Sequence, residues 1–323
     1  MKISVIGLGY LGATHAVAMA KLGHEVLGIE PDPKKLQALN AGVLPFHEPG
    51  LDVALQEVLA DGSLKLASGH SEASRDIELH FICVGTPQLA GSDKADTSYV
   101  FSAAKELASW VSKTAVVAGK STVPVGTAKE LKEEMSKVAG FEVNLAWNPE
   151  FLREGTALED SLSPDRIVVG AWNDHSVTVL KTAYSEILKG GTPFLVLDVP
   201  TAELVKVAAN SFLATKISFI NAMAEVAEVA GADVVALANA IGYDERIGNK
   251  FLRSGVGFGG GCLPKDIRGF VARAEELGVG SAVEFLKDVD AINLRRRQKV
   301  VDLAKQELGS VAGKNCSDAW YFL

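Results

Sequence analysis

The chain has 323 residues, of which 48% are hydrophobic, 22% charged and 7% aromatic, and this composition excludes disordered, collagen-like and coiled-coil proteins. Its 32 lysines and arginines against 40 aspartates and glutamates give a net charge of −8. That balance argues against a nucleic-acid partner, because duplex-binding proteins carry a basic surplus. Three cysteines are too few for a disulfide framework, so a reducing cytoplasm is expected.

Short apolar runs alternate with helical stretches from residue 1 to residue 198. This alternation predicts an α/β fold with a Rossmann-like, doubly wound and mostly parallel sheet that is covered by helices on both faces. Helices are expected, among others, at residues 101–111 and 127–138. The strands are expected at residues 2–6, 25–29, 79–84, 115–120, 142–146, 167–170 and 194–197.

The character of the sequence changes at residues 198–201. Thr201 is predicted to cap a helix that runs to about Ala230, and further helices are expected at residues 233–240, 267–277 and 281–308. A glycine-rich loop at residues 255–261 interrupts them, so the second region is predicted to be helical. The basic run Arg295–Arg297 is interpreted as a solvated helix face. Beyond the N-terminus, no run of about eighteen uncharged apolar residues occurs, so no membrane partner is expected.

Three glycines, Gly7, Gly9 and Gly12, follow the first predicted strand and open the first predicted helix. In this context the first permits a tight turn, the second lets the backbone approach a pyrophosphate, and the third allows close packing of helix on strand. Glu30 ends the second predicted strand, where a carboxylate accepts from ribose hydroxyls and repels a 2′-phosphate. The pattern predicts a dinucleotide site that prefers NAD to NADP.

Cys262 follows the glycine-rich loop and precedes Pro264, Lys265 and Asp266. Proline suits the first turn of a helix, so Cys262 is expected at or near the N-cap. The helix dipole and Lys265 would then favour the thiolate, which is the reactive form. We interpret Cys262 as a nucleophile, with a small buried cysteine as the alternative. Cys83, inside an apolar run, is interpreted as such a buried cysteine.

Two further pairs carry ambiguous signals. Lys206 and Asn210 are one helical turn apart, which is compatible with oxyanion binding or with a solvated face. Glu150 and Glu154 follow a predicted strand, either at the carboxyl edge of the sheet where such folds bind ligands or in a plain charged loop. The six histidines show no metal-ligand spacing and no Cys-x-x-Cys occurs, so no metal is expected.

Together these motifs resemble the UDP-glucose/GDP-mannose dehydrogenase family, from Met1 to about Gly313. The resemblance is carried by the glycine fingerprint and by the segments PFHEPGL (45–51), VGTP (84–87), STVPVGT (121–127) and NPEFLRE (148–154). It continues through residues 203–210 and DERIGNKF (244–251) into the cysteine loop. The stretch from Arg246 to Phe251 is more similar to the UDP-glucose branch of the family than to the GDP-mannose branch.

The resemblance implies oxidation of UDP-glucose at C6 to UDP-glucuronate, with two NAD+ consumed and no free aldehyde released. The catalytic residues that it implies are Cys262 as the nucleophile that forms a thiohemiacetal and then a thioester, Asp266 as base, Lys206 and Asn210 as oxyanion donors, Glu150 for thioester hydrolysis and Thr122 for positioning water.

The resemblance also implies two sets of binding residues. The residues for NAD are Gly7, Gly9, Tyr10, Leu11, Gly12, Glu30, Lys35, Thr86, Thr122 and Glu154. The residues for the nucleotide sugar are Glu150, Phe151, Leu152, Lys206, Asn210, Arg246, Phe251, Arg253, Phe258, Gly259 and Gly260. Arg246 is expected to reach the substrate of a second subunit, in a homodimer built on the long helix.

The sequence departs from the family after Gly313. Family members continue into a C-terminal α/β domain that binds the uridine diphosphate, whereas residues 313–323 resemble a truncation product, so poor turnover is expected. The expected domains are an NAD-binding domain at 1–198, a helical dimerisation and substrate domain at 199–312 and an atypical tail at 313–323. Two alternatives stay open: a GDP-mannose or UDP-amino-sugar 6-dehydrogenase, and a catalytically weak NAD-binding fragment that dimerises.

Overall fold

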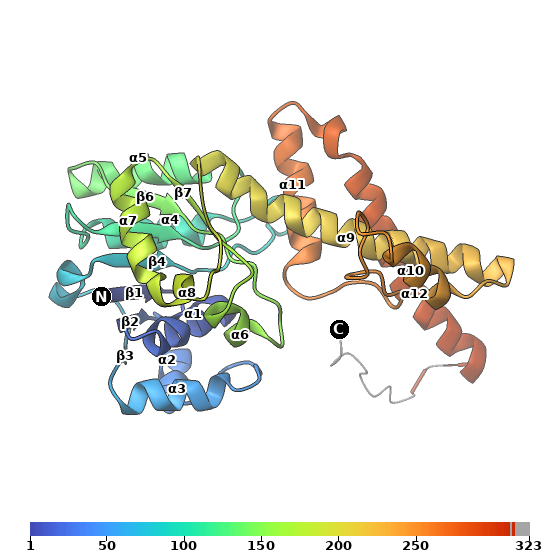
Figure 1. The fold of residues 1–323 in the computed structure, drawn as a ribbon, viewed down its shortest axis with the longest axis horizontal. Helices are drawn as coiled ribbons and strands as arrows, with labels where there is room; N and C mark the ends of the chain where they lie inside the picture. The colour runs from blue at the N-terminus through green and yellow to red at the C-terminus, as the bar shows by residue number, and fades with distance from the viewer. Residues whose placement is uncertain (311, 314–323) are drawn as a thin grey trace. The chain divides into compact units, whose positions relative to one another are not determined.

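The computed structural model describes residues 1–310, 312 and 313, so nearly all of the predicted tail lies outside the described residues. This part of the chain forms two compact units (Figure 1). The first consists of Met1–Pro87 and Ala95–Lys206, and the second of Gln88–Lys94 and the chain from Val207 onward. We describe each unit by itself.

The first unit is built on one eight-stranded sheet with the order β3-β2-β1-β4-β5-β6-β7-β8. Neighbouring strands are parallel except for β6 and β7, which confirms the predicted fold class. The strand order changes direction beside β1, where such sheets bind nucleotides. The strands are β1 (Lys2–Ile6), β2 (Glu25–Ile29), β3 (Leu64–Ala67), β4 (Leu79–Ile82), β5 (Val116–Gly119), β6 (Asn144–Trp147), β7 (Ile167–Ala171) and β8 (Phe194–Leu197).

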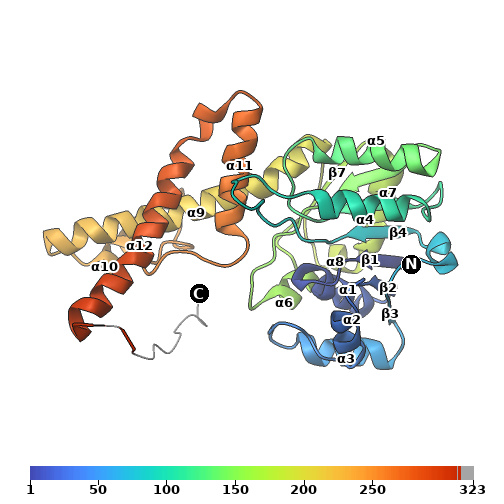
Figure 2. The ribbon, with the colours of Figure 1, turned by 180° about the vertical axis from the view of Figure 1, so that it is seen from behind.

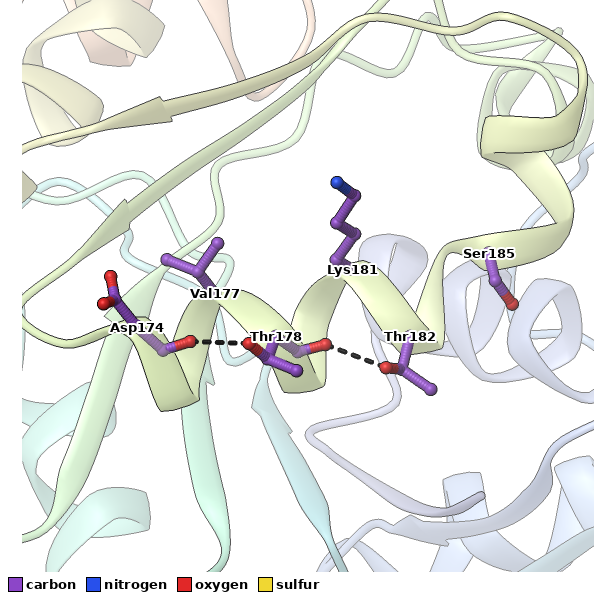
Figure 3. Close-up of a pocket in the computed structure, with 6 residues that line it drawn as sticks. All are labelled: Asp174, Val177, Thr178, Lys181, Thr182 and Ser185. Carbon is purple, nitrogen blue, oxygen red and sulfur yellow. Dashed lines mark hydrogen bonds between the residues drawn. The ribbon is translucent and has the colours of Figure 1, made fainter.

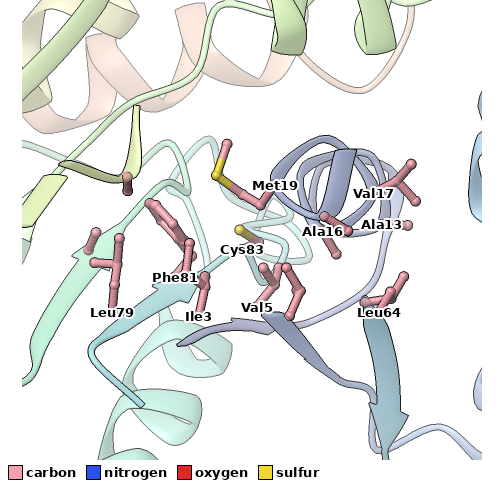
Figure 4. Close-up of a cluster of buried hydrophobic side chains, with 14 of the residues drawn as sticks. Ile3, Val5, Ala13, Ala16, Val17, Met19, Leu64, Leu79, Phe81 and Cys83 are labelled. Atoms are coloured by element: carbon pink, nitrogen blue, oxygen red, sulfur yellow. The ribbon is translucent and has the colours of Figure 1, made fainter. Parts of the chain in front are cut away.

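Helices cover both faces of this sheet (Figures 1 and 2). On one face, α1 (Tyr10–Lys21) and α3 (Leu51–Ala60) bury Met19 and Leu55 in a cluster with Phe81 (Figure 4). On the other, α4 (Ser98–Ala108) and α5 (Thr127–Ala139) bury Leu107 and Leu131. The remaining helices of the unit are α2 (Pro33–Asn40), α6 (Ala157–Leu162), α7 (Asp174–Ala183), α8 (Ser185–Lys189) and a 3-10 turn at Glu72–Asp76.

Two details differ from the sequence-based expectation. The sequence analysis missed β3, a four-residue edge strand in which only Leu64 is fully buried, so no apolar run marks it. The cap predicted at Thr201 is wrong, because α9 (Val199–Ala230) begins at Val199. The carboxylate of Asp198 accepts hydrogen bonds from the Thr201 N–H and hydroxyl, both at 2.8 Å. Asp198, the residue before α9, therefore caps the helix in place of Thr201.

The second unit is helical. It contains the larger part of α9, then α10 (Val234–Gly242), α11 (Leu263–Glu276), a 3-10 turn at Gly280–Val283 and α12 (Phe285–Leu308). Its main buried cluster comprises Ala214, Phe258, Ile267, Val271, Leu286 and Val289. Among the described residues, no helix has both the length and the apolar character required to cross a membrane.

Candidate active site

The glycine fingerprint forms a tight loop between β1 and α1. Gly7 adopts a φ of +84°, and a Cβ there would lie 2.7 Å from a Val84 methyl group. A Cβ on Gly12 would lie 1.8 Å from the Gly7 carbonyl oxygen, whereas one on Gly9 would meet nothing within 4 Å. Gly9 is also the N-cap of α1, with no side-chain cap. The loop is therefore closed towards the protein and open at Gly9, where a pyrophosphate would meet main-chain N–H groups.

Glu30 directly follows β2, and its buried carboxylate binds two main-chain N–H groups. One carboxylate oxygen accepts from the Leu8 N–H at 3.0 Å and the other from the Asp32 N–H at 3.1 Å. A carboxylate offers about four lone-pair positions, so these two bonds leave acceptor capacity for ribose hydroxyls. The open face at Gly9, the uncapped helix and this carboxylate fit an NAD molecule.

The loops that follow β4 and β5 are joined at the carboxyl edge of the sheet. The Thr86 hydroxyl donates to the Thr122 carbonyl at 2.8 Å, and the Ser121 hydroxyl donates to the Val84 carbonyl at 2.6 Å. Thr86 is buried, whereas Thr122 is half-buried. Thr122 thus lies on the fixed edge at which a parallel sheet presents its ligand-binding groups.

Glu150 and Lys206 form a buried ion pair. Their Oε1 and Nζ atoms are 3.0 Å apart, and only 14% and 6% of the side chains are exposed. The other Glu150 oxygen accepts from the Leu152 N–H at 2.6 Å. The Lys206 ammonium also lies 5.6 Å from the ring centre of Phe151. Neither residue is part of a solvated face.

A buried lysine that the sequence analysis missed fixes the start of this loop. Lys120, at the end of β5, donates to Asn148 Oδ1 at 3.1 Å and to the Tyr184 hydroxyl at 3.3 Å. Tyr184 donates to the same Asn148 oxygen at 2.6 Å, and the Asn148 amide donates to the Val168 carbonyl at 2.8 Å. Burial lowers the pKa of Lys120 from its ordinary 10.5 to about 8. In the sequence, the one sign that Lys120 is buried is its position directly after an apolar strand.

Glu48, inside the PFHEPGL segment, is a second residue that was missed. Its side chain is buried and accepts from the Tyr10 hydroxyl at 2.5 Å and from the N–H groups of Gly155 and Ala157 at 2.9 and 2.7 Å. Burial and Glu48 raise the pKa of the Tyr10 hydroxyl above its usual range. Glu48 thereby ties the first residue of α1 to the loop after Glu154, which is itself exposed.

In the second unit, Cys262 is the N-cap of α11 and is exposed, with Pro264 in the first turn. Asp266 is buried one turn further on. One of its oxygens accepts from the Asn210 amide at 2.7 Å and the other from the Lys265 ammonium at 2.6 Å. The N-cap position predicted for Cys262 is confirmed, and Asn210 faces Asp266 instead of solvent. Cys83, in contrast, is buried in the sheet core (Figure 4), and burial raises its pKa to about 12.

The remaining predicted residues differ in exposure. Arg246, Phe251, Arg253, Gly259, Gly260 and Lys35 are exposed, and Tyr10, Leu11, Phe151 and Leu152 are half-buried. Arg246 pairs with Asp244 through 2.6 and 3.0 Å contacts. Phe258 is buried in the apolar cluster of the second unit, so its ring packs in the core of that unit.

The prediction that Arg295–Arg297 forms a solvated face is wrong for two of the three side chains. Arg296 donates to the Gly255 carbonyl at 3.1 Å and Arg297 donates to the Phe258 carbonyl at 2.6 Å. Arg295 pairs with the exposed Glu225. A glycine-rich loop leaves carbonyl groups without helix or sheet partners, and guanidinium groups can satisfy them.

A shallow hollow runs along α7 (Figure 3) and contains none of the predicted site residues. The hydroxyls of Thr178 and Thr182 donate to carbonyls of the preceding helical turn at 2.8 and 2.9 Å. Both hydroxyls are therefore bonded within α7. In the described part of the chain, no group of three or more histidine, cysteine, aspartate or glutamate side chains is arranged to bind a metal ion.

Comparison with known proteins identifies both units. Residues 1–188 match the NAD-binding domain, and residues 200–295 the central domain, of the UDP-glucose/GDP-mannose dehydrogenase family. The UDP-glucose 6-dehydrogenase of Rickettsia typhi is 41% identical over 98% of this chain and 72% of its own length. A UDP-glucose 6-dehydrogenase of Bacillus subtilis is 38% identical over 97% of this chain and 70% of its own length.

Solved structures agree with the sequence matches. The UDP-glucose dehydrogenase of Pyrobaculum islandicum superposes with a TM-score of 0.88 at 39% identity, over 95% of this chain and 71% of that one. The GDP-mannose dehydrogenase of Pseudomonas aeruginosa gives a TM-score of 0.73 at 31% identity, over 95% and 71%. The chain therefore belongs to the UDP-glucose/GDP-mannose dehydrogenase family of NAD-dependent oxidoreductases.

Proposed function

We propose that this chain oxidises C6 of UDP-glucose to the carboxylate of UDP-glucuronate through a covalent intermediate on Cys262. The observation that carries the proposal is the exposed Cys262 at the N-cap of α11, one turn before the buried Asp266–Asn210 pair. An exposed sulfur at a helix N-terminus is suited to nucleophilic attack. The names of the relatives support UDP-glucose as the sugar nucleotide.

The first unit would bind the cofactor. The N–H groups at the start of α1 would bind its pyrophosphate, and Glu30 would bind its adenosine ribose; Thr86, Thr122 and Glu154 would lie towards its nicotinamide. Lys35 would contribute from the first turn of α2. When bound, NAD+ supplies the hydride acceptor for both oxidations.

The proposed reaction has four steps. The C6 alcohol first loses a hydride and a proton and becomes an aldehyde. The Cys262 sulfur adds to the aldehyde carbon, and the former carbonyl oxygen takes a proton, which gives a thiohemiacetal. A second hydride leaves this carbon and a proton leaves its hydroxyl, which gives a thioester. Water then attacks the thioester carbon and gives one proton to a base, the C–S bond breaks, and the sulfur leaves as the thiolate. The resulting carboxylic acid loses the second proton and becomes the carboxylate.

Five further residues would assist these steps. Asp266 accepts a proton, and Lys206 and Asn210 stabilise negative charge on the oxygen at C6. Glu150 assists the attack of water on the thioester, and Thr122 positions that water. The Glu150–Lys206 ion pair supports these roles, because it holds the two side chains together in a buried environment. The exposed Phe251, Arg253, Gly259 and Gly260 would contact the sugar nucleotide.

We also propose a homodimer formed through α9, with Arg246 reaching the substrate of the other subunit. Phe212, Phe219 and Val226 are exposed and recur every seven residues along this helix, so they form one apolar stripe on a helix surface. Burial in a dimer would remove the stripe from water. A reducing cytoplasm suits the proposed chemistry, because a catalytic thiol must stay reduced.

The proposal is tested by incubating the purified chain with NAD+ and UDP-glucose, GDP-mannose or a UDP-N-acetylamino sugar, and following NADH absorbance together with product mass. We expect two NADH for each UDP-glucuronate and a clear preference for UDP-glucose. Preference for another sugar nucleotide would replace the substrate within the same chemistry. An aldehyde product with one NADH per molecule, and no carboxylate, would contradict the thioester route.

A further inference from the structure

The loop that precedes Cys262 is fixed by side chains from two helices. The Gly255 N–H donates to Asn221 Oδ1, on α9, at 2.8 Å, and the Gly255 carbonyl accepts from Arg296, on α12. Phe258 is bound in the same manner by Asn293 and Arg297, both on α12. Both main-chain polar groups of Gly255 and of Phe258 therefore have side-chain partners far away in the sequence.

Asn293 binds both main-chain polar groups of Phe258. Its Oδ1 accepts from the Phe258 N–H at 2.7 Å, and its amide donates to the Phe258 carbonyl at 2.9 Å. The side chain is 1% exposed, so water cannot replace either bond. A carboxamide that binds both groups of one residue fixes that residue as a neighbouring β-strand would, and each bond is costly to lose when buried.

Gly257 shows how closely Asn293 and the loop fit. Its φ is +97°, and a Cβ there would lie 2.2 Å from Asn293 Oδ1. A side chain at Gly257 would thus displace the group that binds Phe258. The ring of Phe258 is anchored in the apolar cluster of the unit, whereas Gly259 and Gly261 are exposed, with no atom nearer than 3.7 Å to a Cβ built on either. The loop is therefore fixed at Phe258 and has open space at Gly259 and Gly261.

We propose that Asn293 and Arg297 are positioning residues that fix Phe258, so that Gly259–Gly261 and Cys262 meet the substrate in one arrangement. The inference rests on the proposed function, in which Cys262 is the nucleophile. Both residues act through the Phe258 main chain and touch no reacting atom. Misplacement of a reacting group by about 1 Å can lower a rate on the order of 100-fold, so loss of these bonds affects kcat as well as KM.

The test compares Arg297→Ala with Arg295→Ala, a matched control two residues away that removes a surface arginine paired with Glu225. Asn293→Ala removes both bonds to Phe258, and Asn293→Asp keeps only the acceptor. Arg297→Lys restores a donor. Each variant is measured for kcat and KM, for NAD+ affinity, and for amide hydrogen exchange of residues 255–262.

We expect Arg297→Ala and Asn293→Ala to lower kcat about 10- to 100-fold and to speed exchange in residues 255–262, with NAD+ affinity unchanged. Arg297→Lys should recover most of the rate, Asn293→Asp should be intermediate, and Arg295→Ala should match the unaltered chain. Equal effects of Arg297→Ala and Arg295→Ala would overturn the inference. So would faster exchange without loss of kcat. If Asn293→Ala does not fold, the comparison of Arg297→Ala with Arg295→Ala still tests the inference.

These results separate the inference from the proposed function. Hydrogen exchange reports whether Asn293 and Arg297 fix the loop, independently of any turnover. Normal turnover of Cys262→Ser would remove the proposed function and the catalytic meaning of the loop together. Loss of turnover in Cys262→Ser with normal kcat in Arg297→Ala would overturn the inference alone.

Discussion

The molecule has two glycine-rich loops that lead into a helix N-terminus, and they are fixed in different ways. The loop at Gly7–Gly12 packs against Val84 and against its own main chain, and Glu30, 22 residues from Leu8, accepts from the Leu8 N–H. The loop before Cys262 depends on Asn293, which is 35 residues from Phe258, and on arginines 39 and 41 residues from their partners. Local geometry forms the first loop, and tertiary contacts form the second.

This difference explains what each loop can do. A cofactor site that is reused in every cycle benefits from a rigid main chain with few partners that can move. The loop proposed to present a nucleophile needs room for a substrate, and Gly259 and Gly261 leave open space beside it.

Cys262→Ser should lower the rate of carboxylate formation by at least about 1000-fold. The serine hydroxyl is a much weaker nucleophile than a cysteine thiolate, and it cannot form a thioester. The measurement is NADH released per UDP-glucuronate formed. Cys83→Ala is the matched control, since Cys83 is buried in the sheet core and away from the N-cap of α11. Two NADH per product in Cys262→Ser at a normal rate would contradict the assignment.

Lys206→Met should destabilise the fold by about 4 kcal/mol, because it leaves the Glu150 carboxylate buried without its partner. Thermal or urea unfolding measures the change. The double variant Lys206→Met with Glu150→Leu should regain most of the stability and none of the turnover. Glu142→Gln, which breaks the exposed Lys132–Glu142 pair, is the control and should leave unfolding unchanged. A stable, active Lys206→Met variant would refute the role of the ion pair.

The lowered pKa of Lys120 predicts that the free energy of unfolding depends on pH, and it fixes the sign of that dependence. Below about pH 8 the amine is charged in both states, and the fold bears the whole cost of burying it. As the pH rises from about 8 to 10.5, only the unfolded state keeps the proton, so stability rises by about 3 kcal/mol.

The measurement is the difference in unfolding free energy between the unaltered chain and Lys120→Met, which should shift in favour of the unaltered chain over that pH range. The exposed Lys181→Met on α7 is the control, and its difference should stay constant. A constant difference for Lys120→Met would show that Lys120 is not buried as described.

Two glycine substitutions separate packing from ligand contact in the first loop. Gly12→Ala places a methyl group against the Gly7 carbonyl and should cost about 2 kcal/mol of stability or more. Gly9→Ala meets open space, so its melting temperature should stay the same while NAD+ binds at least about tenfold more weakly. Isothermal titration and thermal unfolding measure both. Normal NAD+ affinity in Gly9→Ala would place the pyrophosphate elsewhere.

The sequence predicted what depends on short spacing. The order of strands and helices, the glycine fingerprint, Glu30 and the N-cap position of Cys262 all follow from residues within about one turn or one strand–turn–helix unit. Residues whose partners are remote were missed or misread. Lys120 meets Asn148 28 residues away, Glu48 meets Gly155 107 residues away, and Arg297 resembles any basic residue until its carbonyl partner is known. No local pattern encodes such pairs.

Glu30 limits how the cofactor preference of this chain can be redesigned. Since its two oxygens accept from the N–H groups of Leu8 and Asp32, replacement by arginine or alanine to admit a 2′-phosphate would also strand two main-chain donors. Asparagine keeps one acceptor oxygen, so it would retain part of this bonding while removing the charge. An NADP-dependent variant would therefore require a rebuilt turn after β2 together with a new residue in place of Glu30, which we propose binds the ribose.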